Sequence, residues 1–156
     1  MKGKLTIGSL VCVIAAASAS IPLGSAAVGS ERTITAIQKG TGIAFVDADR
    51  NGMPSIGDYE VGTAVYVKPA SGKAIGRSSV VCTQINAAGT QYQCQGLSHF
   101  SGGDVISAGL FSATAKTYSQ AVIGGTGVYS GVTGVLKGTF LDATFSRTKV
   151  TFTLHS

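Results

Sequence analysis

The sequence is short of charge, and the charges it has form no cluster. Only 12% of its 156 residues are charged, and the Lys and Arg residues are scattered along the chain without a run. Nucleic-acid-binding proteins instead gather basic residues on one face or along one segment. We therefore expect no nucleic acid among the partners of this chain.

Long apolar runs are missing as well, apart from one near the N-terminus. Two lysines precede an uncharged apolar run from Leu5 to Ala17, and small residues follow it. This order is typical of a secretory signal peptide, and the run is shorter than the roughly 20 apolar residues of a membrane span. Cleavage could follow Ala19 or Ala27, and we favour Ala27. We predict a signal peptide over residues 1–27, a secreted or periplasmic location, and no membrane span after cleavage.

Cysteine and histidine are rare. Once the signal peptide is removed, Cys82 and Cys94 remain, and an even count in an exported domain favours a disulfide over a metal site. Two buried free thiols are the alternative. The two histidines, His99 and His155, have no Ser, Cys or carboxylate partner at a recognisable spacing. We therefore predict neither a catalytic triad nor a zinc site.

Apolar residues at helical spacing are absent after the leader, and the 22 glycines would penalise long helices. Alternating or β-branched runs recur instead, at Thr33 to Gln38 with Ile43 to Val46, Tyr59 to Lys68, Ala74 to Ile85, Gln91 to Ser98, Val105 to Ala113, Tyr118 to Ile123, Val132 to Phe140, and Lys149 to Leu154. Short glycine-rich breaks between them indicate hairpins and antiparallel neighbours. We predict one all-β domain over residues 28–156 with about eight strands, and composition leaves a barrel and a sandwich both open.

The C-terminal third contains an unusual glycine-rich segment. Five glycines fall within eleven residues around Tyr129, namely Gly124, Gly125, Gly127, Gly131 and Gly134. We interpret it as a strand ending at Ile123, a tight turn with positive φ at some glycines, a short turn presenting Tyr129, and a new strand from Val132. A phosphate-binding loop is the rival, but no helix follows and the Gly, Lys, Ser/Thr ending of a P-loop is missing.

The string GGTGVYSGVTG resembles the GGTGxYxGxxG segment shared by bacterial allene oxide cyclase-like barrels and, more loosely, plant dirigent proteins. The acidic turn from Val46 to Val61, the paired cysteines and the turn from Gly102 to Asp104 fit in the same order, so the resemblance spans Thr33 to Leu154. It implies a single eight-stranded antiparallel β-barrel that encloses an apolar cavity. In such relatives the cavity steers a reactive intermediate towards one stereoisomer or closes a ring, chiefly by orientation.

The acidic residues that do chemistry in the dirigent branch are only partly present. The paired aspartates are absent, and Glu60 remains, on the same strand face as Asp58 and Tyr66. If this face points into the barrel, Glu60 is a candidate proton donor or acceptor and Tyr66 a candidate for orienting a ligand. The alternative places Glu60 at a barrel rim in water.

One acidic loop has the spacing of a calcium site. Asp47, Asp49 and Asn51 occupy alternate positions ahead of Gly52, and Asp58 falls at the twelfth position, as in a twelve-residue calcium loop. Against calcium, a proline interrupts the loop, Asp58 replaces the usual Glu, and no helices flank it. A polar turn joining two strands is the alternative, and apart from Ca²⁺ we expect no cofactor.

Together these features predict a secreted β-barrel that binds a small hydrophobic molecule. If it is an enzyme, we expect an isomerase or cyclase that positions a reactive intermediate for cyclisation or stereoselective coupling. The alternative is a non-enzymatic extracellular or envelope protein that uses its surface for interactions, with calcium as a stabilising ion, since fold does not dictate function.

Overall fold

The computed structural model describes residues 29–156, and the predicted signal peptide lies outside them. The described residues form eight strands and one short 3₁₀ helix: β1 (Glu31–Val46), β2 (Tyr59–Val67), β3 (Ala74–Gln84), β4 (Gln91–Phe100), β5 (Gly103–Ser112), β6 (Thr117–Gly125), η1 (Gly127–Tyr129), β7 (Thr133–Phe140) and β8 (Arg147–His155).

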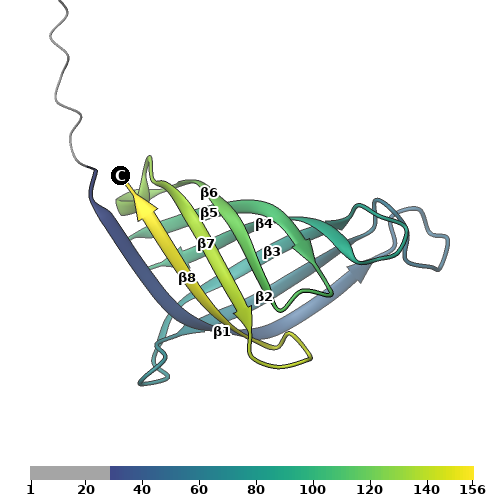
Figure 1. The fold of residues 1–156 in the computed structure, drawn as a ribbon, viewed down its shortest axis with the longest axis horizontal. Helices are drawn as coiled ribbons and strands as arrows, with labels where there is room; N and C mark the ends of the chain where they lie inside the picture. Colours follow the sequence, from purple (N-terminus) through teal and green to yellow (C-terminus); the bar gives the residue numbers. More distant parts are fainter. Residues whose placement is uncertain (1–28) are drawn as a thin grey trace, which may run out of the picture.

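Each strand pairs antiparallel with the next, and β1 also pairs with β8, which closes a barrel (Figure 1). Closure pairs every strand on both sides over part of its length, which removes most of the open sheet edge. The far end of β1, from Gly42 to Val46, extends beyond β8 and pairs with β2 alone. The all-β class and the eight-stranded antiparallel barrel are confirmed.

The first strand is longer than predicted. The glycines at 40 and 42 suggested a break, but β1 runs through them with a β-bulge, in which Thr41 is the extra residue. A bulge shifts the alternation of side chains by one residue. Consequently, Ile43 and Phe45 point to the same side of the sheet as Ala36 does before the bulge.

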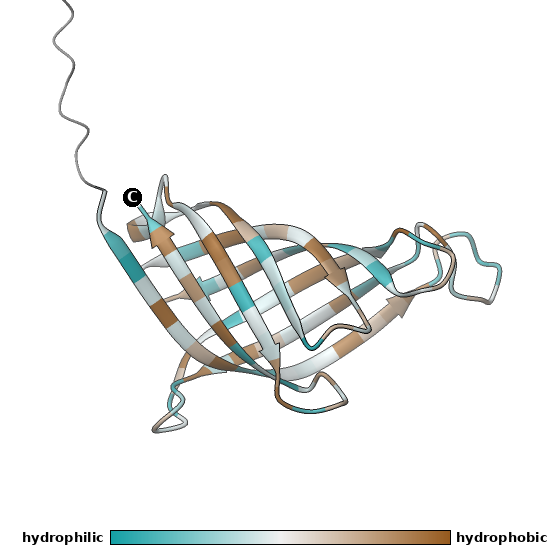
Figure 2. Ribbon diagram, viewed as in Figure 1, coloured by the Kyte–Doolittle hydropathy of each residue, from teal (hydrophilic) through white to brown (hydrophobic). Residues whose placement is uncertain are grey.

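The apolar core fills one end of the barrel, which we call the closed end: the end where β1 begins and β8 finishes. Its buried cluster includes Tyr66, Phe100, Tyr129 and Phe152. The Tyr66 and Phe100 rings stack at 5.2 Å between centroids, and both meet Phe152 edge-on. Apolar residues alternate with polar ones along the strands that supply this core (Figure 2).

The glycine-rich segment belongs to this closed end. Gly127 and Gly131 adopt φ values of +59° and +75°, as predicted for some of these glycines. Gly125 differs, because its φ is not positive; a Cβ there would lie 2.5 Å from the carbonyl oxygens of both Asp104 and Tyr129. Tyr129 is only 1% exposed, so the turn inserts this ring into the barrel end instead of presenting it to solvent.

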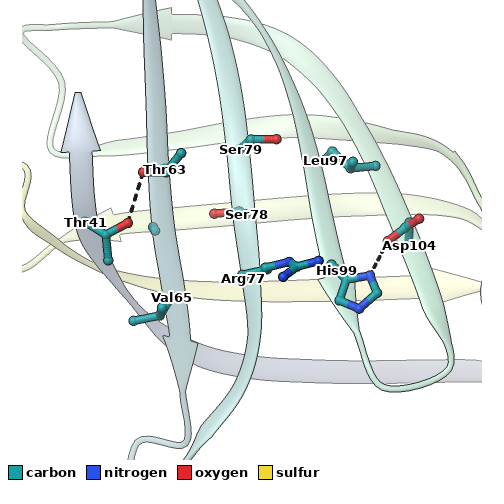
Figure 3. A pocket seen from close by; sticks show the side chains of 10 residues that line it. Thr41, Thr63, Val65, Arg77, Ser78, Ser79, Leu97, His99 and Asp104 are labelled. Atoms are coloured by element: carbon teal, nitrogen blue, oxygen red, sulfur yellow. Dashed lines mark hydrogen bonds and ion pairs between the residues drawn. The ribbon is translucent and has the colours of Figure 1, made fainter. Parts of the chain in front are cut away.

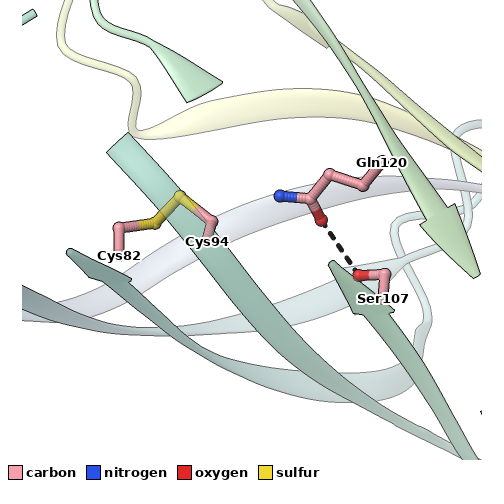
Figure 4. Close-up of a disulfide and its surroundings, with 4 residues drawn as sticks. All are labelled: Cys82, Cys94, Ser107 and Gln120. Carbon is pink, nitrogen blue, oxygen red and sulfur yellow. Dashed lines mark hydrogen bonds between the residues drawn. A yellow bond between two sulfur atoms is a disulfide. The ribbon is translucent and has the colours of Figure 1, made fainter. Parts of the chain in front are cut away.

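The predicted disulfide is confirmed. Cys82 on β3 and Cys94 on β4 are directly opposite each other in the strand register and are bonded, with 4.0 Å between their Cα atoms (Figure 4). The bond joins two neighbouring strands on the inward face of the barrel wall.

Within residues 29–156, no helix has the length and apolar character needed to cross a membrane.

Candidate ligand site at the open end of the barrel

The opposite end of the barrel, where β1 finishes and β2 begins, is not filled by the core, and we call it the open end. Ile43 and Phe45 lie opposite Gly62 and Glu60 in the strand register. Gly62 and Glu60 share a face of β2 with Tyr66, which is buried in the core. Ile43 and Phe45 therefore face inward, yet they are 75% and 48% exposed. The open end thus has an apolar inner wall in contact with solvent.

An aromatic cluster forms the other side of the open end. Its members come from the ends of four strands and from the loop after β7: Tyr92, Phe111, Tyr118, Phe140 and Phe145. The closest ring pair is Phe140 and Phe145, at 4.6 Å between centroids. Phe145 has a positive φ of 55°, which is uncommon for an aromatic residue.

The loop that contains Phe145 is held by Asp142. The carboxylate of Asp142 accepts hydrogen bonds from the backbone N–H groups of Thr144 and Ser146 at 3.2 and 2.9 Å, and from both hydroxyls. Desolvation is the largest single effect on Asp142 and raises its pKa, but the four hydrogen bonds together outweigh it and lower that pKa. The anchored loop keeps the Phe145 ring over the aromatic cluster.

Glu60 is half-buried on the inward wall of the open end. In the strand register it lies beside Cys82, which in turn is opposite Cys94, so a carboxylate and the disulfide share one inward row. Burial raises the pKa of Tyr92, and the negative charge of Glu60, on the same inward face, raises it further. The predicted face of Glu60 thus does point into the barrel.

A polar belt lies between the open end and the closed-end core, although Tyr118 of the aromatic cluster also packs against that core. The hydroxyl of Tyr66 is 2.8 Å from that of Ser98, and Gln38 donates to Ser78 at 3.4 Å. Across the barrel, the Ser107 hydroxyl donates to the Gln120 side-chain oxygen at 3.0 Å (Figure 4). Burial raises the pKa of Tyr66, an effect that its hydrogen bonds only partly offset. We define the polar belt as these side chains: Gln38, Tyr66, Ser78, Ser98, Ser107 and Gln120.

The structure does not bring Glu60 and Tyr66 together, although they share a face. Six residues of extended strand span about 20 Å, so Glu60 lies on the wall of the open end and Tyr66 at the depth of the polar belt. The glycine-rich segment with Tyr129 is at the closed end and lines no part of the open end. A single small ligand therefore cannot contact all of the predicted residues.

The acidic loop between β1 and β2 does gather its carboxylates. Asp47, Asp49 and Asp58 each offer an oxygen, and these three atoms lie within 4.8 Å of one another. Asp58 is buried and accepts hydrogen bonds from the backbone N–H groups of Ala48 and Ser55 at 2.8 and 2.7 Å. Three converging carboxylates are suitable ligands for a hard cation such as Ca²⁺.

Asn51 and Ser55, which also belong to this loop, form hydrogen bonds with other loop residues. The Asn51 side-chain amide donates to Asp49 at 2.9 Å, and its oxygen accepts from the backbone N–H of Met53. The pKa of Asp49 is lowered, chiefly by the hydrogen bond from the Ser55 hydroxyl. Asn51 thus holds the loop through Asp49, next to the three carboxylates.

One expectation about histidine was wrong. His99 has a carboxylate partner, because the tight turn at residues 101–102 places it opposite Asp104 in the register of β4 and β5. The His99 Nδ1 lies 2.6 Å from Asp104 Oδ1, and the Thr126 hydroxyl donates to Asp104 Oδ2 at 3.2 Å. This pair is on the outer face of the barrel, away from the open end.

The closed eight-stranded antiparallel barrel has the allene oxide cyclase-like fold, so the resemblance to that family and to dirigent proteins is confirmed at the level of the fold. No protein-family model and no curated protein matches the sequence.

Solved structures do match it. A pyocyanin demethylase aligns with a TM-score of 0.67 and 25% identity, covering 79% of this chain and 99% of that one. A pterocarpan synthase dirigent protein aligns with a TM-score of 0.63 and 18% identity, covering 81% of this chain and 94% of that one. An exo-specific intermolecular Diels–Alderase aligns with a TM-score of 0.64 and 13% identity, covering 82% of this chain and 100% of that one.

Proposed function

We propose that the open end of the barrel binds a small, largely apolar molecule and directs its cyclisation or stereoselective coupling. The observation that carries this proposal is the exposure of Ile43 and Phe45 on the inward face of β1. An inward apolar wall that stays in water is costly unless something covers it. A ligand seated there would remove these side chains from solvent and meet the aromatic cluster on the opposite side.

The polar belt supports a ligand that is not wholly apolar. Its hydroxyl and amide groups lie below the open end, where they can orient one oxygen-bearing part of a molecule whose remainder packs on the aromatic rings. Fixing two reacting parts of one molecule in this way lowers the entropic barrier to joining them. Positioning, with no covalent step on the protein, is therefore the mechanism that we propose.

Glu60 is the residue that we propose for proton transfer. It is a half-buried carboxylate on the inward wall, and its negative charge acts on Tyr92. A carboxylate in such a place can accept a proton from an enolisable or phenolic ligand, or return it to a product. Tyr66, buried and bonded to Ser98, is proposed to act indirectly, by holding the polar belt in place below a ligand that Glu60 contacts. The fold-level likeness to a Diels–Alderase and a dirigent protein supports reactions of this general kind.

Binding can be tested with an uncharged fluorescent probe, N-phenyl-1-naphthylamine. The variant Ile43→Ser should weaken probe binding, because it removes an apolar side chain from the inner wall. Leu110→Ser is the matched control, since Leu110 is 61% exposed but lies on the outer face of β5. Equal affinity in wild type and Ile43→Ser, or an equal loss in both variants, would contradict a site at the open end.

Catalysis needs its own test once a ligand is known. Glu60→Gln keeps the shape of the side chain, so ligand affinity should stay within a few-fold while product formation falls about a hundredfold or more. Binding without any turnover in the wild type would instead indicate a non-enzymatic extracellular or envelope protein. Secretion is part of the proposal and rests on the predicted leader and on the disulfide.

We also propose that the loop from Asp47 to Asp58 binds Ca²⁺, because its three carboxylates converge. Added Ca²⁺ should then raise the melting temperature of the wild type, and Asp49→Asn should lose this rise. Asp142→Asn is the control, since Asp142 is another exposed loop carboxylate bonded to backbone N–H groups. An unchanged melting temperature in the wild type would rule calcium out.

A further inference from the structure

A groove of about 460 Å³ crosses the outer face of the barrel over β2 to β5. Two rows of side chains line it, because neighbouring strands are in register. The first row runs across four strands as Val65, Arg77, His99 and Asp104. The second row contains Thr63, Ser79 and Leu97, with Thr41 at its end (Figure 3).

The charges in the first row leave one cation without a carboxylate. Both Asp104 oxygens accept hydrogen bonds, one from His99 and the other from Thr126, and the positive charge of Arg77 also lowers the pKa of this carboxyl from further away. Arg77 extends towards His99 (Figure 3), but from residue 29 to residue 156 no carboxylate oxygen lies within 4.0 Å of its guanidinium. An exposed guanidinium with five donors beside a concave surface is suited to a carboxylate or phosphate group.

Further positive charge continues the same row. Lys39 on β1 is opposite Val65, and Arg147 on β8 is opposite Lys39. Neighbouring strands are about 4.8 Å apart, so the Lys39 backbone is about 10 Å from that of Arg77. Three cations and one carboxylate thus line this row, and its excess of positive charge attracts anions.

His99 forms the edge of the groove next to Arg77. Its Nδ1 bonds the Asp104 carboxylate and so carries a proton, which leaves Nε2 as the unbonded ring nitrogen. The hydroxyls of Thr63 and Ser79 offer neutral hydrogen bonds nearby, while Val65 and Leu97 provide apolar surface.

We propose that this outer groove binds a small organic anion. Its carboxylate or phosphate group is held by Arg77, and a short apolar body lies over Val65 and over Leu97, whose side chain is 42% exposed. The groove is on the outside of the barrel wall, so this inference does not depend on the function proposed for the open end.

The test is a ¹H–¹⁵N NMR titration of the full domain against chloride at matched ionic strength. Sulfate probes the charged group alone, acetate adds a minimal body, and butyrate adds a longer apolar one. We expect saturable shifts at the amides of Arg77, Leu97 and His99, with tighter binding of butyrate than of acetate.

Two variants at position 77 and one control make the titration decisive. Arg77→Gln should weaken sulfate and butyrate about tenfold or more, and Arg77→Lys should lose less because the charge remains. Lys137→Gln removes one charge from β7, on another part of the wall, and should leave both affinities unchanged. Shifts that never saturate, shifts confined to the open end, or an unchanged affinity in Arg77→Gln would each overturn the proposal.

Discussion

Removing the disulfide tests how much the wall of the barrel depends on the bond between β3 and β4. Cys82 and Cys94 are 12 residues apart, and closing a loop of this length stabilises the folded state by roughly 3 kcal/mol in the chain-entropy model. For the 128 residues from 29 to 156, unfolding entropies of about 2.1 cal/mol/K per residue convert this into a melting temperature lower by roughly 11 °C.

The assay is urea unfolding of the double variant Cys82→Ala/Cys94→Ala, followed by circular dichroism because the chain has no tryptophan. Relative to the oxidised wild type, the variant should have a lower free energy of unfolding. Adding reductant to the wild type should lower its free energy of unfolding by about the same amount. A loss below about 1 kcal/mol, or a wild type that reductant leaves unchanged, would refute the reasoning. The bond would then restrict a hairpin that is already ordered in the unfolded chain.

Three further predictions concern glycine, a carboxylate and pH. Gly125→Ala should destabilise the fold by about 3 kcal/mol or more, because the new Cβ would meet two backbone oxygens, whereas Gly131→Ala, with open space and a positive φ, should cost about 1–2 kcal/mol in urea unfolding. Glu60→Gln should retain the melting temperature while reducing turnover, and a reduction of stability alone would argue against a catalytic role. The pKa of Asp104 is lowered, chiefly by the hydrogen bond from His99, so its stabilising effect is present above about pH 4 and is lost as pH falls through the lower folded value. His99→Ala should therefore flatten the fall of stability below about pH 4, and an unchanged slope would contradict this coupling.

The fold was predictable because strand alternation and glycine breaks are local signals. Runs such as Gln91 to Ser98 and the short breaks after them define antiparallel hairpins without knowledge of distant contacts. The bulge at Thr41 was not predictable in this way, since it depends on the register of β1 against β2. That single extra residue decides that Ile43 and Phe45 face inward, and it is why the inner wall of the open end was missed.

The sequence predicted which side chains of the candidate site point into the barrel, but not their positions along the barrel axis. Alternation correctly put Glu60 and Tyr66 on one face, yet it carries no information on how far apart they lie along the barrel axis. The same limit applies to Tyr129, whose turn could have presented the ring to solvent until its packing against Phe100 was known. Packing inside a closed barrel is a property of all eight strands together.

The pairing of His99 with Asp104 shows a signal that was available. A two-residue turn at Gly102 in a hairpin fixes the residues on either side as neighbours, so a spacing of five across such a turn predicts contact. Searching for partners along one strand overlooks such pairs. The Thr126 hydroxyl, 22 residues away, had no comparable signal, because only the closed-end turn brings it to Asp104.

Native mass spectrometry of the protein purified from its own source tests the central claim most directly. The account predicts a fraction of molecules that carry one small, largely apolar compound, which Ile43→Ser releases and Leu110→Ser retains. A chain that is free of any bound compound in every preparation, and that also fails to bind an uncharged apolar probe, would contradict a ligand site at the open end of the barrel.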